Sequence, residues 1–74
     1  MKITGTNSYM NVEYNGRTVR FEGELLIDGF CAYENSVRWL SPHDNEPVTT
    51  KEKEEIIAAV LKEVENKDVK IYFE

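Results

Sequence analysis

The sequence predicts a single α+β domain: an antiparallel β-meander of four or five strands, one amphipathic helix packed on one face, and a closing C-terminal strand. Three observations favour this fold. Residues 47–66 have the only sustained helical period, alternating apolar and polar residues precede them, and a short alternating run follows them. A chain of 74 residues has room for one hydrophobic core, so we expect residues 1–74 to form one domain.

The clearest strand pattern is a hairpin. Tyr9–Tyr14 and Thr18–Glu22 both alternate, and the apolar residues that fall on one face are Met10, Val12, Tyr14, Val19 and Phe21. Asn15-Gly16 lies between the two runs and is the preferred pair for a type I′ turn, because both central residues need positive φ. A shorter strand over Met1–Ile3 is expected before this hairpin, since turn residues follow it.

The meander is expected to continue after Gly23, which predicts a bulge or bend. A second hairpin turn is predicted at Asp28-Gly29, and the strands around and after it are expected at 24–27, 30–33 and 37–40. Leu25–Ile27 and Phe30–Ala32 are continuous apolar runs. Such runs are typical of a strand covered on both faces, or of one that contacts another chain.

One helix and one strand complete the chain. The apolar stripe of the helix consists of Ile56, Ile57, Val60, Leu61 and Val64. Thr49 and Glu52 have the spacing of a capping box, and Pro47 lies just outside the helix start. The closing strand is expected over Val69–Phe73.

The sheet face away from the helix is predicted to mix aromatic and charged residues. It would carry Tyr9, Arg20, Glu22 and Tyr72, with either Leu26 or Trp39. Such a mixture resembles a protein interface, but isolated exposed tyrosines are also common on ordinary surface, so both interpretations stay open.

Composition limits the classes of protein that this chain represents. The net charge of −5 disfavours nucleic-acid phosphates and favours basic partners, although it is also ordinary for a small soluble protein. No apolar run approaches the roughly 20 residues that span a bilayer, and no signal peptide is visible. The single cysteine, Cys31, cannot form an internal disulfide and is expected in the core. These features predict a cytoplasmic protein without a membrane segment.

No pattern of catalytic or cofactor-binding residues is present. His43, Asp44 and Glu46 share one polar loop, but a single histidine without a cysteine partner does not make a zinc or transition-metal site. Ser36, Ser41 and Cys31 are the available nucleophiles, and none lies in a nucleophile elbow or beside a glycine-rich loop. We therefore expect no enzyme activity, no metal and no cofactor.

Binding of single-stranded nucleic acid by a homo-oligomeric sheet domain is the alternative function. Such binding needs aromatic platforms and a basic groove. The sequence supplies aromatic residues at Tyr9, Tyr33, Trp39 and Tyr72. Only three arginines, Arg17, Arg20 and Arg38, lie on predicted strands, and the overall charge is negative. The composition therefore disfavours this alternative, while the open sheet face leaves a homodimer open.

Several segments together resemble a known bacterial family. They are Met1–Thr6, the stretch Gly16–Leu25 (GRTVRFEGEL), Val37–Leu40 (VRWL), Asp44–Thr49 (DNEPVT) and the closing Lys70–Phe73. As a set they are similar to immunity protein 74 of polymorphic toxin systems, over nearly the whole chain. The resemblance implies a protein that binds a cognate toxin inside the producing cell and blocks it by occlusion, without chemistry.

The residues themselves suggest where such contacts lie. Trp and Arg are enriched at binding hot spots, and acidic residues complement a basic toxin. We therefore predict that the contact surface includes Glu34, Arg38, Trp39, His43, Asp44 and Glu46. For Trp39 a core position beneath the helix is the alternative to a position in the interface.

Overall fold

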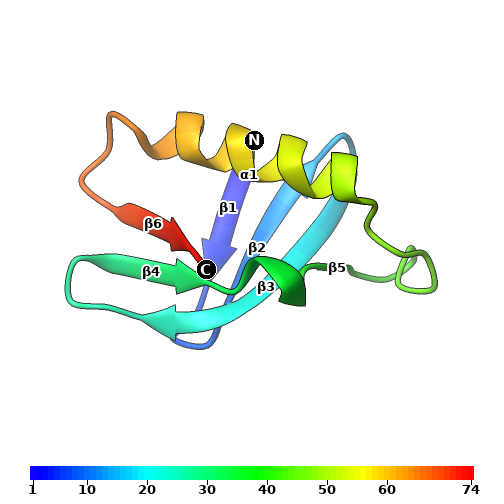
Figure 1. Ribbon diagram of the computed structural model, residues 1–74, viewed down its shortest axis with the longest axis horizontal. Coiled ribbons are helices and arrows are strands. Elements are labelled where there is room, and N and C mark those ends of the chain that lie inside the picture. The colour runs from blue at the N-terminus through cyan, green and yellow to red at the C-terminus, as the bar shows by residue number, and fades with distance from the viewer.

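The computed structural model describes all residues 1–74 and confirms the α+β class. A curled sheet wraps around one helix, α1 (Thr50–Val64), which lies across its concave side (Figure 1). The strands are β1 (Lys2–Gly5), β2 (Tyr9–Tyr14), β3 (Arg17–Leu25), β4 (Gly29–Ala32), β5 (Arg38–Trp39) and β6 (Lys70–Phe73). A short 3-10 helix, η1 (Glu34–Ser36), joins β4 to β5.

The strand order is β1-β2-β3-β4-β6, and β5 pairs with β3 beside this path. The meander therefore ends at β4, because the two-residue β5 pairs with the first half of β3 instead of continuing next to β4. All pairs are antiparallel except β4 and β6, which run parallel. A parallel pair needs a long crossover connection, which α1 supplies between these strands.

The two hairpin turns differ from each other. Asn15 (φ 51°) and Gly16 (φ 79°) form the turn between β2 and β3, so the turn predicted there is confirmed. The second turn is displaced by one residue, since Leu26 and Gly29 exchange backbone hydrogen bonds of 2.7 and 3.4 Å across Ile27 and Asp28. The predicted turn at Asp28-Gly29 was therefore wrong by one position.

Glycine is needed at position 29 for a different reason. A Cβ at Gly29 would lie 1.9 Å from the carbonyl oxygen of Lys70 on the neighbouring β6. Gly23 likewise allows a close approach, because its Cβ would lie 2.1 Å from the carbonyl oxygen of Cys31. β3 runs through Gly23 as one strand that curves, so the expected bend is present without a break in the strand (Figure 1).

The helix begins as predicted. The backbone N–H of Glu52 donates to Thr49 Oγ1 at 3.1 Å, and the Thr49 N–H donates to Glu52 Oε1 at 3.0 Å, which completes the capping box. Ile56, Val60 and Val64 are buried, but Leu61 is 45% exposed, so the buried stripe is narrower than the predicted one.

The core fills the space between the helix and the concave side of the sheet. Its buried members are Met10, Val12, Val19, Phe21, Phe30, Ala32, Trp39, Ile56, Val60, Val64 and Ile71. Because inward residues of β2 and β3 pair directly (Met10 with Phe21 and Val12 with Val19), the first hairpin forms the floor of this core.

Candidate functional site

The loop between β5 and α1 projects from one end of the molecule (Figure 1). Its backbone is closed by two hydrogen bonds, from His43 N–H to the Leu40 carbonyl (3.0 Å) and from Glu46 N–H to the His43 carbonyl (3.1 Å). His43 Nδ1 also lies 3.3 Å from Glu46 Oε2. The loop therefore has a defined shape and presents Asp44 and Glu46 as exposed carboxylates.

Arg17 connects this loop to the rest of the fold. Its guanidinium lies 3.5 Å from Glu46 Oε1 and 3.1 Å from Glu52 Oε2, and Cζ lies 4.0 Å from the centroid of the Trp39 ring. A guanidinium can bind a carboxylate and stack on an aromatic ring at the same time. Arg17 therefore ties the loop to the helix start and to the core, a role that the sequence did not reveal.

The Glu52 carboxylate is stabilised in its charged form. The backbone N–H of Thr49 lowers the pKa of Glu52 most, and the Thr49 hydroxyl and the Arg17 guanidinium lower it further. The helix start thus carries a fixed negative charge beside the loop, within reach of Arg17.

Trp39 takes the core position that the sequence left as an alternative. Its side chain is 2% exposed and packs in the hydrophobic core, so the ring itself is not part of the surface. The indole Nε1 is buried without a hydrogen-bond acceptor. We therefore remove Trp39 from the predicted contact residues, because β5 turns Arg38 outward and Trp39 inward.

The remaining predicted residues lie on the surface but in two groups. His43, Asp44 and Glu46 share the loop, whereas Glu34 and Arg38 lie in η1 and β5. Glu34 is half-exposed, and its N–H donates to the Glu74 carbonyl at 2.8 Å. Arg38 is exposed and lies 3.5 Å from Glu22 Oε2.

The outer face of the first hairpin is polar and internally paired. Arg20 Nε donates to Asn11 Oδ1 at 2.9 Å, and its guanidinium stacks 3.7 Å from the Tyr9 ring centroid. Together with the contacts of Arg17 and Arg38, each of the three strand arginines already contacts a neighbour within the protein. These arginines therefore do not form an open basic groove of the kind that single-stranded nucleic acid requires.

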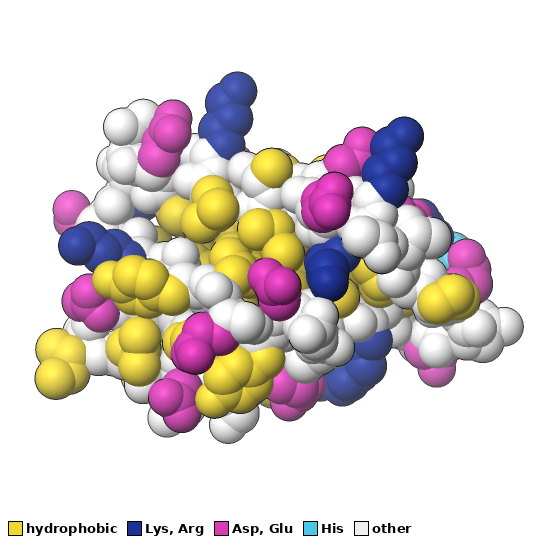
Figure 2. Space-filling model, in the orientation of Figure 1, with side chains coloured by type: hydrophobic (Ala, Val, Ile, Leu, Met, Phe, Trp, Pro, Cys, Tyr) yellow, Lys and Arg dark blue, Asp and Glu magenta, His cyan; other side chains and the backbone are white.

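The other half of the sheet carries a different surface, which we name the acidic-aromatic face: Glu24, Ile27, Asp28, Tyr33, Tyr72 and Glu74. In Figure 2, apolar and acidic side chains alternate along the lower left of the molecule, where β4 and β6 lie. The Tyr72 hydroxyl donates to Asp28 Oδ2 at 2.7 Å, and Cys31 Sγ lies 2.8 Å from Glu74 Oε2.

The carboxylates of this face raise the pKa values of three neighbouring groups. The Glu74 carboxylate raises the pKa of the Cys31 thiol to about 11, with burial of the thiol and the charge of Glu24 adding to the shift. The charge of Glu24 raises the pKa of Tyr33, and the hydrogen bond to Asp28 raises the pKa of Tyr72. A thiol with a raised pKa is a poor nucleophile at neutral pH, as expected from the sequence. Cys31 is buried as predicted, but its thiol lies beside Glu74 and it is not a member of the cluster beneath the helix.

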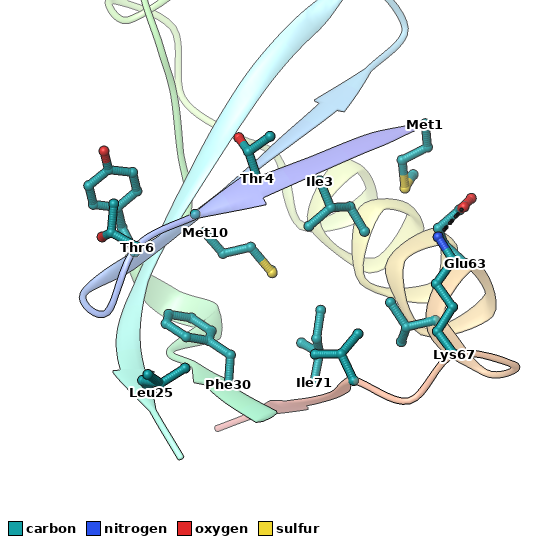
Figure 3. A pocket seen from close by; sticks show the side chains of 14 residues that line it. Met1, Ile3, Thr4, Thr6, Met10, Leu25, Phe30, Glu63, Lys67 and Ile71 are labelled. Atoms are coloured by element: carbon teal, nitrogen blue, oxygen red, sulfur yellow. Dashed lines mark hydrogen bonds and ion pairs between the residues drawn. The ribbon is translucent and has the colours of Figure 1, made fainter. Parts of the chain in front are cut away.

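An apolar cavity of about 310 Å³ lies between the two edge strands of the sheet, β1 and β6 (Figure 3). Ile3 and Met10 point into it from the β1 side, and Phe30 and Ile71 from the opposite side. Its charged lining residues, Glu63 and Lys67, form an ion pair with each other at 3.3 Å. The lining therefore suits an apolar group.

Two further properties bear on the class of protein. None of the helices has both the length and the apolar character needed to cross a bilayer. No three His, Cys, Asp or Glu side chains lie close enough together to share a metal ion.

Comparison with known proteins then gives the family. The model of the family described as Immunity protein 74 matches residues 2–74. The chain belongs to the Immunity protein 74 family. The resemblance found in the sequence is thus confirmed over essentially the whole chain. No curated protein and no solved structure gives a significant match.

Proposed function

We propose that this Immunity protein 74 member binds a cognate toxin in the cytoplasm of the producing cell and inhibits it by occlusion, without catalysis. The observation that carries the proposal is the family match over residues 2–74. A protein with a net charge of −5 would be drawn towards a basic toxin, since complementary charge speeds encounter and fixes orientation.

The loop after β5 is the first part of the proposed contact surface. Asp44 and Glu46 are exposed, and the hydrogen bonds within the loop hold its backbone before any partner arrives. A contact surface that is already ordered loses less conformational entropy on binding. The proposed contact set is completed by Glu34, Arg38 and His43. Trp39 is buried and is not a member of the set, but its ring packs against Arg17, which binds Glu46 of the loop.

The first test is whether a toxin gene lies beside this gene, and the second is co-expression of the protein with the product of that toxin gene. The wild-type protein should rescue growth, and the double variant Asp44→Ala/Glu46→Ala should rescue less well. Glu54→Ala/Glu55→Ala is the matched control, because it removes the same charge from two exposed helix positions.

Two results would contradict different parts of the proposal. If the wild-type protein does not bind or neutralise that toxin, the function is wrong. If the loop variant and the control rescue equally well, the function stands and the loop is not part of the contact surface. Thermal denaturation of each variant separates lost binding from lost folding.

A further inference from the structure

We propose that the acidic-aromatic face docks a basic segment of the toxin, one in which Arg or Lys alternates with apolar residues. This inference rests on the proposed function and names both a surface and the chemistry of its partner. The face lies on the outer side of β3, β4 and β6, opposite the side that α1 covers, and η1 borders it through the hydrogen bond from the Glu34 N–H to the Glu74 carbonyl.

The apolar part of this face is exposed to solvent. Ile27 is fully exposed at the turn between β3 and β4, and Tyr33 and Tyr72 are each 41% exposed. Large apolar side chains that gather at one place on a small protein mark an interaction surface more often than isolated ones do. Tyrosine is also among the residues enriched at the centres of protein interfaces.

The charge of the face selects the partner. Glu24, Asp28 and Glu74 form no ion pair with a basic side chain, whereas each strand arginine elsewhere on the sheet is already engaged. Lys70 is the basic residue that shares the outer side of β6 with Tyr72, so the carboxylates outnumber it. The charge of Glu24 is also the largest cause of the raised pKa of Tyr33.

Internal hydrogen bonds hold the face in shape. The Tyr72 hydroxyl is fixed by Asp28 at 2.7 Å, the Tyr33 N–H by the Glu22 carbonyl at 2.8 Å, and the Glu74 N–H by the Ala32 carbonyl at 2.9 Å. A binding surface whose backbone and Tyr72 side chain are already held needs little reordering when a partner arrives.

These features together fit a basic peptide segment. Arginine can stack on the tyrosine rings while its guanidinium meets the flanking carboxylates. Apolar side chains next to it would cover Ile27. Nucleic acid is repelled by the same carboxylates. The face is continuous with Glu34, which follows Tyr33 in the chain and belongs to the contact set proposed above.

The test measures binding of the purified toxin domain to immobilised full-length protein at low and moderate salt. Tyr33→Ala should raise Kd by about tenfold or more, as loss of an interface tyrosine commonly does. Glu24→Gln/Asp28→Asn keeps side-chain size and should lower the association rate by several-fold and flatten its salt dependence. Glu54→Gln/Glu55→Gln, with the same loss of charge on the far helix, should change neither quantity by more than about twofold.

The outcomes separate this inference from the proposed function. If the toxin binds the wild-type protein and the face variants keep its Kd and its salt dependence, the inference is overturned and the function stands. If the face variants and the helix control lose the same amount, net charge and not this face steers the partner, which also overturns the inference. If the wild-type protein does not bind, the proposed function itself fails. Unchanged melting temperatures for Tyr33→Ala and Glu24→Gln/Asp28→Asn confirm that the comparison is between folded proteins.

Discussion

Replacing Arg17 by methionine tests whether one side chain couples the loop to the fold. Methionine keeps much of the aliphatic stem but removes the contacts to Trp39 (4.0 Å), Glu52 (3.1 Å) and Glu46 (3.5 Å). The Arg17 side chain is 29% exposed, so the stacking contact on Trp39 is partly desolvated and contributes about 1 kcal/mol. The ion pair with Glu46, whose side chain is 51% exposed, adds less, whereas the pair with Glu52 is partly buried like the stacking contact.

A loss of 1 kcal/mol lowers the melting temperature of a domain this small by about 4–8 °C. We expect Arg17→Met to fall in that range when unfolding is followed by circular dichroism, with a change in Trp39 fluorescence. Arg17→Lys is the matched control: it keeps the charge but loses the planar fork, so it should recover only part of the loss. If Arg17→Met melts within 1 °C of the wild-type protein, the coupling role is refuted.

Three further changes probe other parts of the fold. Thr49→Ala removes the capping box and should lower the free energy of unfolding by about 1 kcal/mol in urea titrations, while an unchanged midpoint would contradict its role. Gly29→Ala should lower the free energy of unfolding by about 3 kcal/mol, because the new Cβ meets the Lys70 carbonyl. Gly16→Ala strains only the backbone of its turn and should lower it by about 1 kcal/mol. An equal loss at both sites would refute the role of the close approach at Gly29. Folding raises the pKa of the Cys31 thiol from 9.0 to about 11, so the stabilising effect of the protonated thiol is complete below pH 9 and is lost as the pH rises through 11. The urea midpoint of the wild-type protein should therefore fall over this pH window, and it should fall less in Cys31→Ala. Equal falls in both proteins would show that the thiol does not cause the loss of stability.

Local sequence signals predicted the parts of the fold that depend on near neighbours. The capping box at Thr49 and the type I′ turn at Asn15-Gly16 each involve at most four consecutive residues, so both can be predicted from the sequence alone. The alternation of inward and outward side chains along β2 and β3 was predictable for the same reason.

Contacts between distant segments were not predictable in this way. Nothing near β5 indicates that it returns to β3, and nothing near β6 indicates a parallel partner. Gly29 read as a turn residue, because the strand that requires its missing Cβ lies far along the chain.

The residues of the candidate sites also divide into those that neighbouring residues predict and those that depend on distant contacts. The acidic loop could be found from its composition, but Arg17 could not be linked to Glu46 and Glu52, which are brought beside it only by the finished fold. From the sequence, Trp39 was predicted as a contact residue, with the core as the alternative. The pairing of β5 with β3 turns its ring into the core.

The parallel pair of β4 and β6 has a consequence for the order of folding. β4 can pair with β6 only after the chain has closed a loop of roughly forty residues between Gly29 and Lys70, and closing so long a loop is slow. Until then β4 is an unprotected edge, open to pairing with other copies of the chain. The carboxylates of Glu24 and Asp28 nearby would repel such copies, so the charges proposed to attract a toxin would also guard the nascent protein against aggregation.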